Sequence, residues 1–315
     1  MTRRCRIAVI GTFTRDQIVP PTGGETVESI GGLYYTVAAL AHMPGLSAEI
    51  FPISRLGEDI WDQVTGRLSR LPGVRLDAIH RHSMPNTRVN LIYRNVQVRD
   101  EITTQPMHAL GFREVALAIE MDMTIVNLIT GEDIKLGALQ TLTERAGGPV
   151  YLDFHTLALG MDSEGKRYYR RPEKWEAWVA SSHLLQLNAN EAATLATGSP
   201  RIGDATLARF AREALTLGPQ VCNVTLGPRG SLVAYKSDGD IITHWIDAYP
   251  ADEVVDVTGC GDAFAAGFVA GHLLGWGPLE SAHFANKVAG LNCTVLGTER
   301  IGEISQTLQE DVAES

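Results

Sequence analysis

The stretch "VVDVTGCGDAFAAGFVAG", from Val254 to Gly271, places two glycines around a cysteine and follows them with an aspartate. Small and apolar residues come next, and their pattern predicts a helix that starts near Cys260. The first turn of a helix has backbone N–H groups without intrahelical partners and carries a partial positive charge. Glycines let a ligand approach the backbone closely. The segment therefore predicts an anion pocket made of main-chain amides, with Asp262 beside it.

Two explanations account for an acid in this position. Asp262 can accept a proton from a hydroxyl group while the amides hold a phosphoryl group during transfer. It can equally be the N-cap of the helix, which is a common role for aspartate. The motif on its own leaves both explanations open.

The composition narrows the classes of protein and partner. The chain has 315 residues, of which 44% are hydrophobic and 20% charged, as in ordinary globular proteins. The formal net charge of −10 disfavours nucleic-acid binding. The basic segment "KRYYRRPEK" (166–174) has interleaved tyrosines that would suit RNA, but it is better explained as a surface loop before a helix. We expect no nucleic-acid partner.

The cysteines and the hydropathy predict where the protein resides. The 4 cysteines are scattered without a CxxC pair, which is typical of free thiols in a reducing cytosol. No apolar run approaches the roughly 18 residues that span a membrane. The apolar run "IAVI" near the N-terminus is too short for a signal peptide. We therefore expect a cytoplasmic protein with no membrane contact.

The order of elements predicts an α/β fold. Apolar strands such as "IAVIG" (7–11), "MTIVNLI" (123–129) and "HLLQLN" (183–188) alternate with amphipathic helices. This rhythm predicts a mostly parallel, Rossmann-like sheet covered by helices on both faces, in three layers. Two polar, hairpin-like segments interrupt the rhythm, so we assign 12–30 and 85–105 to a small β lid. The core then comprises 1–11, 31–84 and 106–315.

"DVTGCGDAFAAGFVAG" resembles the C-terminal signature, D-T-x-G-A-G-D-x-F, of the ribokinase-like (PfkB) carbohydrate kinases. The resemblance implies a ribokinase-like fold and an ATP- and Mg2+-dependent kinase. It makes Asp262 the catalytic base and the amides of Gly259, Cys260 and Gly261 the anion hole. Cys260 replaces the usual alanine, another small residue. Asp256 is implied to lie near the K+ loop that many members have.

Three further segments resemble nucleotide-binding motifs of this family. "LNANEA" is similar to N-x-x-E, which implies Asn188 near the nucleotide phosphates and Glu191 in the magnesium shell through water. "VTLGPRG" is similar to T-x-G-x-x-G, and "FANKVAG" to the late helix that borders the adenine. Without the resemblance these segments are a capped helix start, a hairpin turn and an ordinary helix. The implied nucleotide contacts in the last two are Thr225, Gly227, Gly230 and Asn286.

"GTFTRDQIV" and "GETVESIGG" are similar to the family's opening strand, acidic sugar contact and di-glycine. Asp16 is implied to bind sugar hydroxyls, and Gly31 and Gly32 to let the backbone approach the sugar. The alternative is that Asp16 is a surface acid in a hairpin. The lid would close over the substrate and exclude water, and in relatives it often makes a homodimer contact.

One departure affects the substrate. The family usually has G-G-x-x-x-N, whereas this chain has "GGLYYTV" with Thr36 in the place of the asparagine. We assign Thr36 to the substrate floor, which has thus lost an amide. Tyr34 and Tyr35 either stack on a base or sugar or fill the core. The expected function is phosphorylation of a hydroxymethyl group on a sugar or sugar-containing molecule; a nucleoside kinase and a catalytically silent sugar- or nucleotide-binding regulator are the alternatives.

A second phosphate-binding motif is nearly present but is rejected. "GMDSEGKR" (160–167) approaches the P-loop G-x-x-x-x-G-K-[ST]. Arg167 stands where the magnesium-binding hydroxyl must be, and Asp162 and Glu164 would direct negative charge at phosphates.

Overall fold

The computed structural model describes residues 4–20, 25–94, 99–251, 253–295 and 301–313. Its main feature is a 9-stranded sheet in the order β15-β14-β13-β12-β9-β8-β1-β4-β5. Seven neighbouring strands from β13 to β5 pair in parallel, and β14 and β15 pair antiparallel at one edge. The strands are β1 (Cys5–Ile10), β4 (Ala48–Gly57), β5 (Ile79–His82), β8 (Met123–Asn127), β9 (Val150–Asp153), β12 (Leu184–Asn188), β13 (Val221–Thr225), β14 (Ser231–Ser237) and β15 (Asp240–Ile246).

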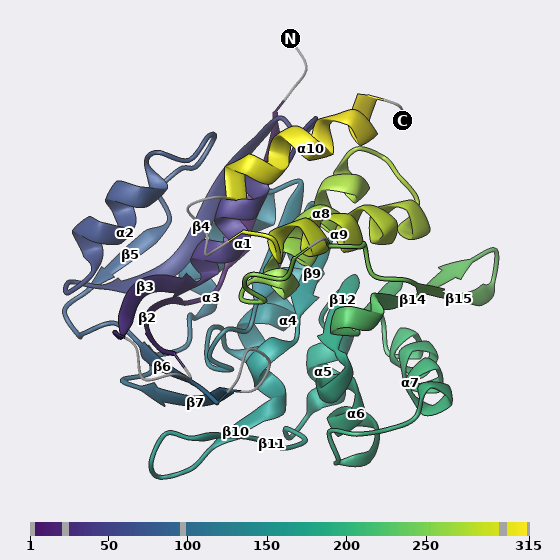
Figure 1. Cartoon of the computed structure of the whole chain (residues 1–315), viewed down its shortest axis with the longest axis horizontal. Coiled ribbons are helices and arrows are strands. Elements are labelled where there is room, and N and C mark those ends of the chain that lie inside the picture. The colour runs from purple at the N-terminus through teal and green to yellow at the C-terminus, as the bar shows by residue number, and fades with distance from the viewer. Residues whose placement is uncertain (1–3, 21–24, 95–98, 252, 296–300, 314–315) are drawn as a thin grey trace.

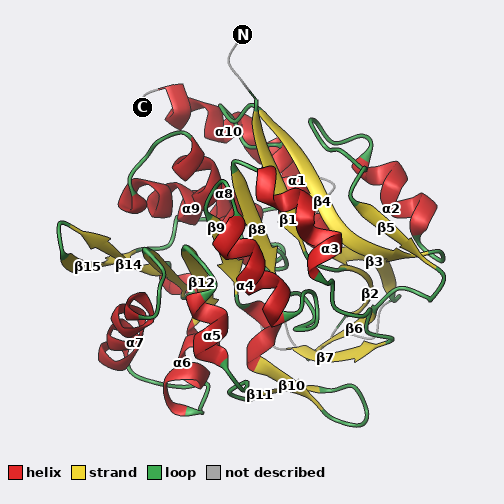
Figure 2. Ribbon diagram, turned by 180° about the vertical axis from the view of Figure 1, so that it is seen from behind, coloured by secondary structure: helices red, strands yellow, loops and turns green. Residues whose placement is uncertain are grey.

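Helices cover both faces of this sheet, which confirms the predicted three-layer fold (Figures 1 and 2). Alternate residues of a strand point to opposite faces, so Ile7 and Val9 of β1 enter one apolar core and Ala8 and Ile10 enter the other. Among the described residues, no helix is long and apolar enough to cross a bilayer. The first core is closed by α1 (Leu33–Ala41), α2 (Trp61–Leu68), α8 (Cys260–Leu273), α9 (Pro278–Asn292) and α10 (Ile301–Ala313), and the second by α3 (Phe112–Val115), α4 (Leu136–Arg145), α5 (Trp175–Ala180), α6 (Ala189–Thr197) and α7 (Asp204–Thr216).

A separate 4-stranded sheet forms the predicted lid (Figure 1). Its order is β3-β2-β6-β7, in which β2 and β6 pair in parallel and the other two pairs are antiparallel. The strands come from the two polar segments that the sequence set apart from the core. Gly31 and Gly32 end β3, although the prediction assigned them to the core, and residues 21–24 and 95–98 of the predicted lid lie outside the described residues. The bounds are β2 (Phe13–Val19), β3 (Val27–Gly32), β6 (Arg88–Tyr93) and β7 (Arg99–Thr104).

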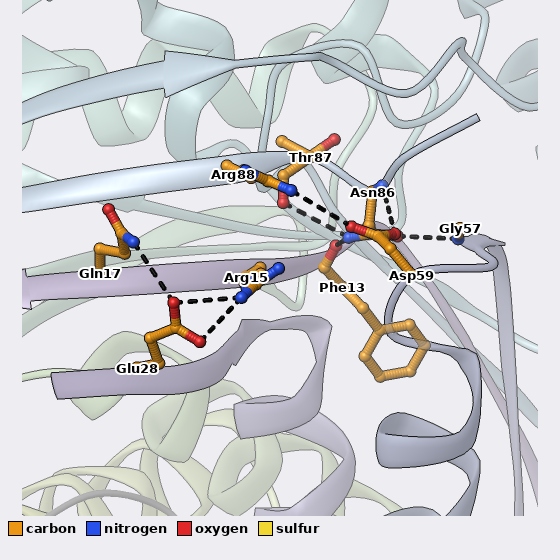
Figure 3. A network of polar contacts seen from close by, with 9 residues as sticks. All are labelled: Phe13, Arg15, Gln17, Glu28, Gly57, Asp59, Asn86, Thr87 and Arg88. Carbon is orange, nitrogen blue, oxygen red and sulfur yellow. Dashed lines mark hydrogen bonds and ion pairs between the residues drawn. The ribbon is translucent and has the colours of Figure 1, made fainter.

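Asn86 joins the lid to the large sheet (Figure 3). The Oδ1 atom of Asn86 accepts from the Gly57 N–H at the end of β4 at 3.1 Å, and its Nδ2 donates to the Phe13 carbonyl at the start of β2 at 2.6 Å. Its own N–H donates to the Asp59 carboxylate at 2.8 Å. Because Asn86 is buried, these bonds hold three segments together at the base of the lid without competition from water.

The near P-loop at 160–167 is a β-hairpin. Residues Leu159–Met161 form β10 and Arg167–Tyr169 form β11, so a strand follows the glycine-containing turn where a phosphate-binding loop requires a helix. The prediction of a loop over 166–174 is therefore wrong for its first part. Arg167 donates to the Thr103 hydroxyl in β7 at 3.1 Å and to the Thr130 carbonyl at 3.0 Å, and this ties the hairpin to the lid and to the loop after β8.

Candidate active site

Helix α8 begins at Cys260, as the sequence predicts, and Gly259 is its N-cap in the left-handed region at φ 77°. A Cβ on Gly259 would lie 2.5 Å from Cδ1 of Tyr35, so both the backbone and the packing require glycine. Gly261 differs, because a Cβ there would meet nothing closer than Gln186 Nε2 at 3.8 Å. Packing within the protein thus explains the first glycine of "GCG" and leaves the second available for the approach of a ligand.

Asp262 lies in the first turn of α8, two residues after Cys260, so the N-cap explanation is wrong. Its side chain is only 7% exposed, and its Oδ1 accepts from the Thr36 hydroxyl at 2.5 Å and from Asn127 Nδ2 at 2.7 Å. Burial raises the pKa of Asp262 to about 6, and the bonds from Thr36 and Asn127 oppose part of that rise. The carboxylate is therefore ionised at neutral pH, and its pKa is close to that of an effective general base.

The sequence reasoning missed Asn127. It ends β8, in line with the polar residues that end β9, β12 and β13, at the edge where ligands bind in open α/β sheets. An asparagine at the end of the apolar run "MTIVNLI" was the available signal. Its Nδ2 donates to Thr36 Oγ1 at 2.9 Å, so an amide from β8 lies where the sequence suggested that one had been lost.

The two tyrosines of "GGLYYT" are buried. Tyr34 belongs to the apolar core that α1 and α8 share, and the ring of Tyr35 lies against Gly259. The core-filling explanation therefore fits Tyr34, while Tyr35 forms one wall beside the predicted anion hole. Thr36, predicted on the substrate floor, is fully buried with its hydroxyl directed at Asp262.

Asp16 and the di-glycine come together at the base of the lid. Asp16 is 5% exposed, so the alternative of a surface hairpin acid is wrong. Its carboxylate fills the space in which a Cβ on Gly31 would stand. Gly32, at φ 60°, is the N-cap of α1, the helix that carries Thr36 to Asp262. Helix α1 thus connects the predicted sugar contact to the predicted base.

Asn188 and Glu191 form a capping box at the start of α6. Asn188 Oδ1 accepts from the Glu191 N–H at 3.0 Å, and Glu191 Oε2 accepts from the Asn188 N–H at 2.8 Å. Asn188 Nδ2 also donates to Glu191 Oε1. Burial raises the pKa of Glu191 to about 8. The geometry is that of the capped helix start, and contacts with phosphate and magnesium remain predictions.

Another buried acid, Asp153, lies close enough to Glu191 and Asp262 to feel the charge of both. It ends β9, and its pKa is raised first by burial and then by the charges of Glu191 and Asp262. Next to it in the sheet, Gln186 Nε2 donates to the Gly261 carbonyl at 3.1 Å and its Oε1 accepts from the Tyr151 hydroxyl at 2.5 Å. The centre of the sheet is thereby bonded directly to the first turn of α8.

The predicted nucleotide residues gather around the end of β13. Thr225 ends this strand, Gly227 at φ 59° opens a short 3-10 turn (Gly227–Arg229), and Gly230 follows at φ 86°. A Cβ on Gly230 would overlap the Ile246 carbonyl. Asn286 of α9 donates to the Ser231 hydroxyl at 2.9 Å, directly after this turn.

Cys260 and Asp256 both lie beside Cys293, the C-cap of α9. The two sulfur atoms are 2.9 Å apart, and both cysteines are free. The Asp256 N–H donates to the Cys293 carbonyl at 3.2 Å, while the Asp256 carboxylate accepts from the Thr258 N–H at 2.9 Å. The described part of the chain contains no group of three or more His, Cys, Asp or Glu side chains that could hold a metal ion.

Comparison with known proteins identifies this arrangement. Residues 162–303, which contain the capping box, the β13 turn and the "GCGD" helix, match the model of the pfkB family of carbohydrate kinases. Over this segment the chain is similar to the PfkB family. Among curated proteins it is similar to a cytidine kinase of Thermococcus kodakarensis, with 27% identity over 308 residues that cover 95% of each chain.

Solved structures show the same fold as this chain. A ribokinase of Arabidopsis thaliana has a TM-score of 0.74 at 21% identity and covers 98% of this chain and 99% of its own. A pyrophosphate-dependent kinase of the ribokinase family has a TM-score of 0.77 at 18% identity, covering 95% and 99%. The ribokinase-like fold is confirmed, and the protein is a sugar or nucleoside kinase.

Proposed function

We propose that the protein transfers the γ-phosphoryl group of ATP to a hydroxymethyl group of a sugar or sugar-containing molecule. The observation that carries the proposal is Asp262 itself. It is a buried carboxylate in the first turn of α8, held by two donors, and burial raises its pKa to about 6. A general base works best when its pKa lies somewhat below or near the working pH.

The reaction then follows from this chain's residues. Asp262 accepts the proton of the acceptor hydroxyl as that oxygen attacks the γ-phosphorus. The bond from phosphorus to the bridging oxygen breaks, and ADP leaves with the bonding electrons. The backbone amides of Gly259, Cys260 and Gly261 hold the charge that develops on the transferred group. No atom crowds the position of a Cβ on Gly261, where Gln186 Nε2 is the nearest at 3.8 Å, and this supports the role of the amides.

ATP would bind around the end of β13 and the start of α6. The residues that would hold it there are Asn188, Thr225, Gly227, Gly230 and Asn286. Magnesium usually keeps several waters and takes few protein carboxylates, and Glu191 is one carboxylate in a suitable place. When bound, magnesium would neutralise charge on the phosphates. Asp256, whose carboxylate orders the loop before α8, would border a potassium ion.

The acceptor would lie between Asp16, the di-glycine and Asp262, under the β lid. Buried Asp16 supports this placement, because a carboxylate beside a cleft can accept from two neighbouring hydroxyls. A nucleoside is the second candidate, favoured by the similarity to a cytidine kinase over nearly the whole chain. A silent binding protein is disfavoured, because a binder has no use for a buried base with two dedicated donors.

The proposal includes the cellular compartment and the partners of the enzyme. The four cysteines are free in the structure, which fits a reducing cytoplasm. A homodimer contact through the lid is expected by resemblance to relatives, and nucleic acid and membrane are not expected as partners.

The test is product formation over a panel of sugars, sugar acids and nucleosides with magnesium. Each acceptor is offered ATP and, in parallel, pyrophosphate, because one structural neighbour uses pyrophosphate. We expect turnover of one acceptor class with ATP, lost in Asp262→Asn by about 10²- to 10⁴-fold. Asp238→Asn, in the exposed turn before β15, is the matched control and keeps full activity. Full turnover in Asp262→Asn would disprove the mechanism, and turnover only with pyrophosphate would correct the donor.

A further inference from the structure

The side chains of Thr36, Asn127 and Asp262 form a closed hydrogen-bonded triangle. Asn127 Nδ2 donates both to Thr36 Oγ1, at 2.9 Å, and to Asp262 Oδ1, at 2.7 Å. Thr36 Oγ1 in turn donates to the same Oδ1 at 2.5 Å. The three residues come from α1, β8 and α8, and 226 positions separate Thr36 from Asp262 in the chain.

Both donors converge on one oxygen of the carboxylate. Charge-assisted hydrogen bonds of this kind are short and directional, so they restrict the rotation of the Asp262 side chain. Thr36 and Asn127 are both fully buried, and no water competes for these donors. The second oxygen, Oδ2, is then the one left to face a reacting hydroxyl.

One atom of this triangle carries a cost for folding. Asn127 Oδ1 is buried without a hydrogen-bond partner among the described residues, and such a group destabilises a fold. A residue retained in spite of such a penalty calls for a functional explanation.

We propose that Thr36 and Asn127 are positioning residues for the reaction: they hold Asp262 through Oδ1 so that Oδ2 takes the proton of the acceptor. This inference rests on the proposed function. It gives Thr36 a role different from the substrate contact that its place in the sequence suggested.

The pH profile of kcat/KM distinguishes positioning from a structural role. Asp262 must be ionised to act, so the rate falls as the pH drops through its pKa of about 6. Thr36 and Asn127 stabilise the ionised form, and removing either donor moves the acid limb to higher pH. Two further buried acids lie near this site, Asp153 and Glu191, and the pKa of Asp153 is raised by the charges of Glu191 and Asp262. Neither is changed in the variants.

The variants are Thr36→Val, which preserves shape, Thr36→Ser, which restores the hydroxyl, and Asn127→Leu. We expect Thr36→Val and Asn127→Leu to lower the plateau of kcat about tenfold or more and to move the acid limb up by about one pH unit. Thr36→Ser should recover most of both. Thr124→Val is the matched control, because Thr124 is a buried hydroxyl on the same strand, bonded to the Ala118 carbonyl.

An unchanged plateau and limb in both Thr36→Val and Asn127→Leu would overturn the inference. So would an equal shift of the limb in Thr124→Val. Failure of the proposed function is distinguishable from failure of this inference. Wild-type turnover in Asp262→Asn would show that Asp262 is not the base. An inactive Asp262→Asn together with unchanged kinetics in Thr36→Val and Asn127→Leu would disprove only the positioning role. If Asn127→Leu does not fold, the comparison of Thr36→Val with Thr36→Ser tests the positioning role by itself.

A second feature of the site, the thiol pair Cys260–Cys293, carries an independent inference. The Cys260 thiol donates to Cys293 Sγ at 2.9 Å, and the Cys293 thiol donates to the Ala289 carbonyl at 3.3 Å. A disulfide needs a sulfur–sulfur distance of about 2.0 Å, so closure requires a movement of about 1 Å. Both residues are half-buried, which leaves a small oxidant access to the pair.

We propose that these two cysteines form a reversible disulfide that disables the anion hole. The Cys293 thiolate attacks one oxygen of hydrogen peroxide, whose O–O bond breaks, and gives a sulfenic acid and hydroxide. Cys260 then displaces the sulfenic oxygen and its proton completes a water molecule. In total, two thiols and one peroxide give one disulfide and two waters.

The bond from Cys260 lowers the pKa of the Cys293 thiol, which makes Cys293 the attacking sulfur. Cys260 is the middle residue of the "GCG" segment, so drawing it toward α9 displaces the amides on either side. A displacement of about 1 Å at a reacting centre lowers a rate by roughly 10²-fold.

Intact-mass and activity measurements after peroxide treatment test this switch. We expect the wild-type protein to lose the mass of two hydrogen atoms and at least about tenfold in rate, both restored by dithiothreitol. Cys293→Ser should keep its activity and its mass under peroxide, and Cys5→Ser, which removes a distant thiol, should behave as the wild type. Inactivation of Cys293→Ser at the wild-type rate, or a wild type that keeps both thiols, would refute the switch. The mass readout stands even if the acceptor is unknown.

Discussion

The carboxylate of Asp16 lies in the space that a side chain on Gly31 would fill, on paired strands of the lid sheet. The two residues therefore constrain each other: an acid can point inward here only because its neighbour lacks a Cβ. This pairing connects the di-glycine to the predicted sugar contact through sterics and does not depend on any bound ligand.

The first prediction is that Gly31→Ala disables acceptor binding. The new methyl group displaces the Asp16 carboxylate, so kcat/KM for the acceptor should fall about 10²-fold, while KM for the donor stays within about twofold of the wild type. Steady-state kinetics with each substrate varied in turn provides the measurement.

Gly66→Ala is the control for this change. Gly66 lies in α2 with nothing near the site of its missing Cβ, so alanine should stabilise the helix by about 1 kcal/mol and leave the kinetics unchanged. An acceptor kcat/KM in Gly31→Ala equal to that of the wild type would show that Asp16 does not contact the acceptor.

Asn86→Ala is expected to loosen the lid from the large sheet. The change leaves the Gly57 N–H and the Phe13 carbonyl without their partner, and the free energy of unfolding should fall by about 2 to 4 kcal/mol. Amides of β2 and β6 should exchange with solvent faster than those of β8. Gln17→Ala, which removes one exposed bond to Glu28 on the same lid, should change stability by less than about 0.5 kcal/mol. Equal effects of the two variants would contradict the anchoring role of Asn86.

Asp133 predicts a pH dependence of stability. It is buried, and its pKa is raised to about 6, chiefly by burial and against the bonds from Thr130 and Gly131. A raised pKa means that the folded protein holds the proton more tightly than the unfolded chain. The contribution to stability is therefore complete below pH 4 and is lost as the pH rises through about 6.

Asp133→Asn removes this titration. The stability of the wild type relative to Asp133→Asn should decline by about 2 to 3 kcal/mol between pH 4 and pH 7.5. Urea unfolding of both proteins at several pH values measures the difference and cancels groups that they share. A difference that stays constant with pH, or that grows as the pH rises, would show that Asp133 is not held in its neutral form.

Asn286→Leu distinguishes the two phosphoryl donors. Asn286 is bonded to Ser231 next to the β13 turn, where the adenine of ATP is expected, so its loss should raise KM for ATP about tenfold. Pyrophosphate has no base, and KM for it should not change. An unaltered KM for ATP would place the adenine elsewhere.

The fold was predictable from the sequence because its signals are local. Apolar runs such as that of β8 are bounded by turns and separated by amphipathic helices, and that rhythm is enough to indicate parallel strands with helices on both faces. The start of α8 at Cys260 followed in the same way from the glycines and small residues around it. The error at 166–174 arose because Arg167–Tyr169 becomes a strand only by pairing with β10 and packing near the lid.

The site was predictable only in part, since its contacts are not local. Asp262 is identified by its own segment, but nothing near it in the chain indicates Thr36 or Asn127, which reach it only when α1 and α8 pack over β8. The burial of Asp16 against Gly31 likewise depends on the register of β2 with β3. The surface-acid alternative at Asp16 is therefore excluded by tertiary structure and the N-cap alternative at Asp262 by the cap of α8, while the roles of both acids in binding and catalysis stay predictions.

The most direct test of the central claim is single-turnover phosphoryl transfer by Asp262→Asn with donor and acceptor bound. The account predicts that this variant binds both substrates with near wild-type affinity and transfers phosphate at least about 10²-fold more slowly. Transfer at the wild-type rate would contradict it and would require another base in the site.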